Sequence, residues 1–258
     1  MDERPPVPDG SILRVTEDWL RDRCNKWSVT LAARASLRML PLLAPATKHA
    51  DPWQNILATF RVCAATWLVA IDPDDDQVVA AARTAKEALE ATIDQFGRNG
   101  LETAVTDAAL HAAEATESSH PASVASAVAF AAANSFAGDA DRVAFATDAI
   151  ALETCDVSPS LLGRRRIWPS WYRKGDRRDL SDHVINLQER WYDLRSPLEA
   201  RQGERWEVWT SWYQGRLDGD KQAPIDISLE KRRVLIPNED WNNGPAHVNA
   251  LIDNLSCG

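Results

Sequence analysis

The 258-residue chain carries a formal net charge of −9, 45% hydrophobic residues and 11 tryptophans. A chain of this length buries enough apolar surface to fold without disulfides or structural metal. Residues 1–155 hold 13 Lys+Arg and 22 Asp+Glu, whereas residues 156–258 hold 16 of each. The acidic first half therefore disfavours non-specific binding of duplex nucleic acid by the whole chain, but a local basic site in the second half remains compatible with these charges.

Apolar residues recur three and four positions apart along nearly the whole chain, and runs with strand-like alternation are missing. This pattern predicts an all-α protein. We expect an irregular antiparallel helical bundle, or a short repeat-like helical array without a fixed repeat period, with a small Trp-rich helical subdomain at the C-terminal end.

The first predicted helix covers residues 16 to 40, with Thr16 as its cap and Pro41 as its end. A second helix follows over residues 52 to 71, capped by Asp51. The acidic stretch "DPDDD" at 72–76 should end this helix and begin the next one.

Residues 77 to 153 are rich in alanine, which favours helices and lets their axes approach closely. Gly97 and Gly100, then Pro121, then Gly138 should divide this region into four helices. We expect these helices to stack tightly and antiparallel.

The segment 155–179 breaks the helical pattern with prolines, glycines and a run of arginines, as a linker or a functional loop does. Short helices are predicted beyond it, within 180–195, 204–217, 227–236 and 244–255. The predicted organisation is an Ala-rich bundle at 1–155, a basic and aromatic connector at 156–176, and a Trp-rich subdomain at 177–258.

The cysteine pattern and the N-terminus predict a cytoplasmic protein. The four cysteines are Cys24, Cys63, Cys155 and Cys257, and they form no C-x-x-C pair, so we expect reduced thiols. The chain starts without the basic and apolar regions of a signal peptide. The longest apolar stretch, 56–71, contains Arg61 and is shorter than a bilayer requires, which predicts a buried core helix and no membrane span.

The sequence "RWEVWTSWYQGRLDG" at 205–219 places aromatic rings on one helical face, formed by Trp206, Trp209, Tyr213 and Leu217. Arg216 falls within this face and Trp212 lies at its edge. A ring-stacking platform for a ligand and the core of a small helical domain both fit this pattern, and we favour the core. Trp212 and Arg216 remain candidate binding residues.

The basic connector is the first place where we would expect a ligand or partner. Residues 164–178 contain seven lysines and arginines interleaved with aromatic rings. Such a mixture can bind single-stranded nucleic acid or a phosphorylated ligand. The alternative, which we favour, is that the arginines pair with the acidic N-terminal half. The candidate binding residues are Arg164, Arg165, Arg166, Trp168, Trp171 and Arg173.

Arg34 and Arg38 lie four residues apart beside the apolar stripe of the first helix, which makes them further candidates. They could bind a carboxylate or phosphate ligand. More commonly, such arginines bridge to acids on a neighbouring helix while their stems cover apolar surface.

No metal site, cofactor or catalytic residue is predicted. Glu117 and His120 have the spacing of one half of a di-metal site, as do His111 and Glu114 in reverse order, but no second Glu-x-x-His pair exists. Nucleophile, phosphate-loop and zinc-protease motifs are missing. A hydrolase remains one alternative, with its carboxylate pair drawn from Glu204, Glu207, Glu239 and Asp240 beside the tryptophans.

The C-terminal third resembles a module of uncharacterised bacterial proteins. The resemblance rests on "WEVWTSWYQGRLDG" and "RVLIPNEDWNNGPAHVNALI", which match W-x-x-W-Y-x-x-x-L-x-G followed by I-P-x-E-x-W-x-x-G-P-x-x-V-N-x-x-I. "LLGRRRIWPSW" and "AARASLRMLPLL" are similar to the same proteins. The resemblance implies an interaction role and identifies no catalytic residue.

These observations predict a non-enzymatic scaffold or adaptor that binds a partner protein, as a component of a multi-protein bacterial system. One alternative is a nucleic-acid or nucleotide-binding module centred on the connector, and another is the carboxylate hydrolase. The sequence leaves the oligomeric state open.

Overall fold

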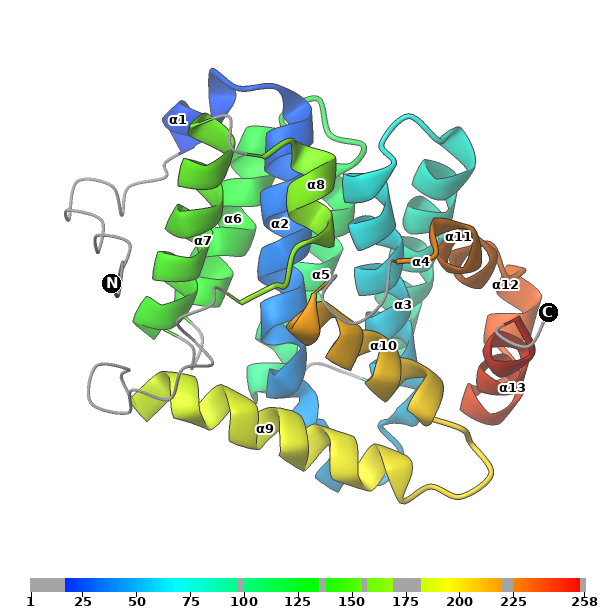
Figure 1. Cartoon of the computed structure of the whole chain (residues 1–258). Coiled ribbons are helices and arrows are strands. Elements are labelled where there is room, and N and C mark those ends of the chain that lie inside the picture. Colours follow the sequence, from blue (N-terminus) through cyan, green and yellow to red (C-terminus); the bar gives the residue numbers. More distant parts are fainter. Residues whose placement is uncertain are drawn as a thin grey trace.

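The computed structural model describes residues 17–96, 100–134, 138–154, 157–168, 182–219 and 225–255. Every regular element within these ranges is a helix. The predicted all-α fold is therefore confirmed (Figure 1).

The N-terminal part consists of α1 (Glu17–Arg21), α2 (Asn25–Met39), the 3-10 helix η1 (Leu40–Lys48) and α3 (Trp53–Ile71). The prediction of one helix over 16–40 was wrong, because Cys24 has extended backbone angles and separates α1 from α2. This turn lets Arg23 stack over the rings of Trp19 and Trp27, at 5.0 and 5.5 Å. Pro41 does end the α-helix, but the chain continues as η1.

The Ala-rich region forms α4 (Asp76–Phe96), α5 (Gly100–Ala115), α6 (Pro121–Asn134) and α7 (Gly138–Glu153). The four predicted helices are confirmed. The acidic turn before α4 acts as a cap, since the carboxylate of Asp75 accepts from the backbone N–H groups of Gln77 and Val78 at 2.9 and 3.3 Å. Asp51 does not cap α3 in the predicted way, because Pro52 occupies the N-cap position.

The C-terminal part consists of α8 (Pro159–Arg164), α9 (Asp182–Glu199), α10 (Glu207–Asp218), α11 (Ile227–Val234), α12 (Asn238–Trp241) and α13 (Pro245–Leu255). The four longer helices correspond to predicted ones. The short helices α8 and α12 were not predicted, because one or two turns carry too little periodicity to recognise.

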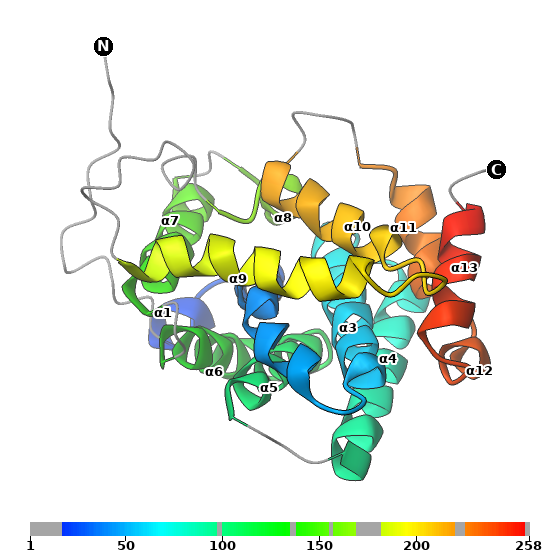
Figure 2. The same ribbon diagram turned by 90° about the horizontal axis from the view of Figure 1, so that it is seen from below.

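The helices α2 and α3 form the centre of the bundle, and nearly all of their residues are buried. Helices α5, α6 and α7 pack around α2, while α4, α8 and α11 pack on α3 (Figure 1). Helix α9 crosses the end of the bundle over η1, as the view from below shows (Figure 2). A single hydrophobic cluster includes residues from both the predicted bundle and the predicted Trp-rich subdomain, so the two parts share one core.

Among the residues that the structure describes, α3 is the helix long and apolar enough to cross a membrane. The bundle buries 89% of its most apolar window. The prediction of a core helix in this stretch is confirmed.

The tryptophan row of α10 belongs to the shared core, as favoured from the sequence. Trp206, Trp209 and Tyr213 are fully buried. Trp212, expected at the edge of the row, is also buried, because its ring meets Trp67 and Phe60 of α3 at centroid distances of 6.1 and 6.5 Å. The buried face is wider than one stripe, since α10 packs against both α9 and the side chains of α3.

Candidate interaction surface

Two buried arginines of α2 hold the start of the connector against the bundle. The Arg34 guanidinium donates to both carboxylate oxygens of Asp148 on α7, at 2.8 and 3.1 Å. It also donates to the backbone carbonyls of Leu162, Arg165 and Arg166, at 2.8, 2.9 and 2.7 Å. One guanidinium group thus joins α2, α7 and the connector.

Arg38 completes this buried arrangement. Its Nε donates to the carbonyl of Ile167 at 2.8 Å, and its guanidinium also donates to Asp148. Burial lowers the pKa of Arg34, although the carboxylate of Asp148 opposes this effect. Both arginines bridge to an acid on a neighbouring helix, the more common of the two arrangements expected from the sequence, and neither faces solvent.

Two glycines allow the connector to approach the bundle closely. The carbonyl of Gly163 accepts from the indole Nε1 of Trp67 at 2.9 Å, and a Cβ at Gly163 would lie 3.0 Å from Ile71. Gly219 has a φ of +67° and its missing Cβ would lie 2.7 Å from the backbone nitrogen of Arg166. The path of residues 162–167 is therefore fixed by backbone contacts.

A second buried charge cluster holds α11 against α10 and α3. Glu230 accepts from Arg216 at 2.7 Å, from Arg233 at 2.6 Å and from the indole of Trp212 at 3.0 Å. The Arg216 guanidinium stacks over the Trp67 ring at 3.7 Å. One carboxylate and the face of a tryptophan ring therefore stabilise the positive charges of two buried arginines. The candidate binding residues Trp212 and Arg216 are thus buried, and both bind Glu230 within the fold.

The three consecutive arginines Arg164, Arg165 and Arg166 differ from the other arginines of the described chain. Their side chains form no hydrogen bond or ion pair, whereas every other arginine described with its side chain has at least one interaction partner. Arg165 is exposed, and the other two are half-buried. The favoured hypothesis, in which the basic residues of the connector pair with the acidic N-terminal half, does not hold for these three arginines, and the other basic residues of 164–178 lie outside the described residues. Instead, Arg34 and Arg38 of the N-terminal half donate hydrogen bonds to the connector backbone.

An exposed leucine lies beside these arginines. Leu161 is 55% exposed and precedes Arg164 by three residues, which makes the two side chains neighbours on α8, and Arg165 follows as the extended residue that ends the helix. We define Leu161, Arg164, Arg165 and Arg166 as the arginine ridge. Hydrogen bonds from Arg34 fix the backbone of the ridge. The three arginine side chains make no hydrogen bond or ion pair within the described structure.

Of the other candidate binding residues of the connector, the structure describes only Trp168. Trp168 is buried, with the Arg38 guanidinium 5.6 Å from its ring centroid. Trp171 and Arg173 lie outside the described residues.

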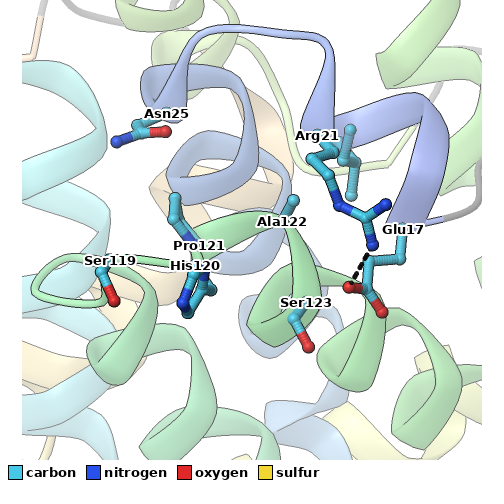
Figure 3. A pocket seen from close by; sticks show the side chains of 9 residues that line it. Glu17, Arg21, Asn25, Ser119, His120, Pro121, Ala122 and Ser123 are labelled. Carbon is cyan, nitrogen blue, oxygen red and sulfur yellow. Dashed lines mark hydrogen bonds and ion pairs between the residues drawn. The ribbon is translucent and has the colours of Figure 1, made fainter.

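A surface pocket of about 470 Å³ lies between α1 and the start of α6 (Figure 3). Its lining includes Arg21, His120 and Ser123, but none of the binding residues predicted from the sequence. The Arg21 guanidinium is already paired with Glu17 and Asp18, at 2.9 and 2.8 Å.

The carboxylates considered for a metal site or a hydrolase are exposed or have other contacts. No group of three or more His, Cys, Asp or Glu side chains among them could hold a metal ion. Glu117 pairs with Arg83 rather than His120, and Glu204 pairs with Arg201. Of the other carboxylates weighed for a hydrolase, Glu207 and Glu239 are exposed and Asp240 contacts His247 at 2.8 Å.

Asp148 and Leu161 contribute to the arginine ridge or its support, and neither was predicted from the sequence. Asp148 lies within an apolar stripe of α7 that includes Phe145, Ala149 and Leu152, and an acid at such a position predicts a buried basic partner. Leu161 follows Ser158 and Pro159, a recognisable helix start, and the Ser158 hydroxyl does accept from the Leu161 N–H at 3.3 Å.

No protein-family model matches the chain, and no curated protein or solved structure is significantly similar to it.

Proposed function

We propose that the protein is a non-enzymatic interaction scaffold that binds an acidic segment of a partner protein through the arginine ridge. The observation that carries this proposal is the set of three consecutive unpaired arginines, on a chain with a net charge of −9 in which the other described arginines have partners. Arginine forms two parallel hydrogen bonds to a carboxylate, so unpaired arginines suit an acidic partner.

The backbone beneath the ridge supports this role. A surface that is already ordered loses less conformational entropy on binding than a flexible one. Arg34 and Arg38 fix the carbonyls of residues 162, 165, 166 and 167. A partner would therefore bind arginines whose backbone is already ordered. Leu161 adds an apolar contact beside the charges, the composition typical of protein interfaces rather than of nucleic-acid backbone contacts.

The test is recovery of partners by the tagged protein from its native host. The ridge variant carries Leu161→Glu and Arg165→Glu. A control carries Arg21→Glu and Arg83→Glu, two exposed arginines that lie outside the ridge and pair with Glu17 and Glu117. We expect the wild type and the control to retain a protein partner that the ridge variant loses, and the purified pair to bind each other directly.

Two outcomes would overturn the proposal. If the ridge variant folds, as judged by circular dichroism, and still retains the partner, the ridge is not the binding surface. If nuclease treatment removes whatever the wild type recovers, the ridge binds nucleic acid and the scaffold hypothesis fails.

A further inference from the structure

A second exposed surface has the opposite charge to the ridge. The described part of the chain exposes three large hydrophobic side chains, Leu161, Tyr192 and Leu235, and Tyr192 is the most exposed at 70%. Glu189 and Asp193 flank Tyr192 on the outer side of α9, at positions three residues before and one residue after it. Glu189, Tyr192 and Asp193 form what we call the acidic face.

The two carboxylates of the acidic face are unpaired. The side chains of Glu189 and Asp193 have no hydrogen bond or ion pair in the described structure, and both residues are exposed. The four-residue spacing places both carboxylates on one side of the helix, with Tyr192 next to them on the side of Glu189. By contrast, Arg195 on the same helix is paired with Glu199 at 2.7 Å.

The acidic face and the arginine ridge are chemically complementary. Each combines one exposed apolar or aromatic side chain with unpaired charges of a single sign. Guanidinium groups can bind the two carboxylates and stack on the tyrosine ring, and the leucine can cover the remainder of that ring.

The two surfaces lie on separate parts of one molecule. Helix α8 lies on the upper half of the bundle in Figure 1, while α9 crosses its lower end. The view from below likewise shows them as separate elements (Figure 2). In the described structure the ridge arginines do not pair with the α9 carboxylates of their own chain.

We propose that the partner segment bound by the arginine ridge is the acidic face of a second copy of this chain. This inference rests on the proposed function, since it names the partner of the same ridge. The contact joins Arg164 and Arg165 of one copy to Glu189 and Asp193 of the other. Because surface charges dominate it, the assembly should weaken as the salt concentration rises.

The test is a charge exchange between two variants, followed by analytical ultracentrifugation. The first variant carries Arg164→Glu and Arg165→Glu, and the second carries Glu189→Arg and Asp193→Arg. Either variant alone brings like charges together and should be monomeric at concentrations where the wild type self-associates. An equimolar mixture pairs Glu with Arg in both possible contacts, so assembly should return. A chain carrying all four substitutions should also self-associate.

The result that overturns the inference is a wild type that stays monomeric at every concentration and at low salt. A mixture that remains monomeric, although both variants melt like the wild type, has the same consequence. If self-association fails but the ridge variant still loses a different protein partner, the proposed function stands and the inference about a second copy falls. If ridge substitutions change neither self-association nor partner recovery, both fail.

Discussion

Arg34 and Asp148 form a bidentate, fully buried ion pair between α2 and α7, with N···O distances of 2.8 and 3.1 Å. Arg38 shares the same carboxylate, so one aspartate balances two buried arginines. Removing the carboxylate would leave both positive charges without a counter-ion in the core.

We therefore expect Asp148→Asn to lower the free energy of unfolding by about 3 to 5 kcal/mol, the usual cost of breaking a buried pair from one side. The measurement is urea denaturation followed by circular dichroism. Glu153→Gln serves as the control, because Glu153 lies on the same helix and pairs with Arg23 at the surface. That change should cost at most about 1 kcal/mol, and equal losses for the two variants would contradict the structural role of Asp148.

In the second buried charge cluster, we expect the loss of Glu230 to lower the free energy of unfolding more than the loss of Arg216. Glu230→Met leaves two buried arginines, Arg216 and Arg233, without a carboxylate, and should cost about 3 to 5 kcal/mol. Arg216→Met leaves Glu230 still paired with Arg233, so the loss should be clearly smaller. Urea denaturation of both variants checks the order, and a larger loss for Arg216→Met would show that Glu230 is not the shared counter-ion.

Three glycines allow steric and conformational effects to be separated. Gly219→Ala combines a positive φ with a Cβ 2.7 Å from the Arg166 backbone, and we expect a loss of about 2 to 3 kcal/mol. Gly203 has a positive φ but open space around its Cβ position, so Gly203→Ala should cost about 1 kcal/mol.

Gly215 lies inside α10 with no heavy atom within 4 Å of its Cβ position. Gly215→Ala should stabilise the protein by about 0.5 to 1 kcal/mol, because alanine loses less backbone entropy in a helix. Thermal denaturation of the three variants gives the ranking. A neutral Gly219→Ala would contradict the close contact between the connector and the end of α10.

Glu204 makes stability depend on pH in the acid range. Burial raises the pKa of this carboxyl, but hydrogen bonds from Arg201 and Trp206 outweigh that effect and leave it below the ordinary value of 4.5. Because the folded pKa is depressed, ionised Glu204 stabilises the protein above pH 4.5, and this contribution is lost as the pH falls through the folded pKa.

We expect Glu204→Gln to be less stable than the wild type at neutral pH, with the gap closing in acid. Urea denaturation across this pH range measures the gap. Glu87→Gln, at an exposed position on α4, should show little difference at any pH. A gap for Glu204→Gln that persists at the acid end would contradict the linkage.

The two described cysteines should differ sharply in reactivity. Burial raises the pKa of Cys63 to about 12, although a hydrogen bond with Ser36 opposes the shift, whereas Cys24 is exposed. The thiolate is the reactive form, so a thiol reagent should modify Cys24 in the native protein and Cys63 only after unfolding. Mass spectrometry of native and denatured samples, with Cys24→Ser and Cys63→Ser as references, checks the assignment. Native modification of Cys63 would contradict its burial.

The sequence was sufficient for the helical class, the four Ala-rich helices and the placement of the tryptophan row on one helical face. Each of these depends on local properties: alanine favours helix, glycine and proline interrupt it, and the spacing of Trp206, Trp209 and Tyr213 puts their rings on one face. These preferences act within a few residues and need no knowledge of distant neighbours.

The tertiary structure decided which of the described arginines are paired inside the fold and which are not. From the sequence, Arg34 and Arg165 are equivalent cations, yet Arg34 meets Asp148, 114 residues further along the chain, while Arg165 meets no acid. Ion pairs between distant segments depend on how the helices pack, and periodicity does not encode that packing. The local pattern therefore determined the helices, and the packing of α2 against α7 and the connector determined that the ridge arginines are unpaired within the part of the chain that the structure describes.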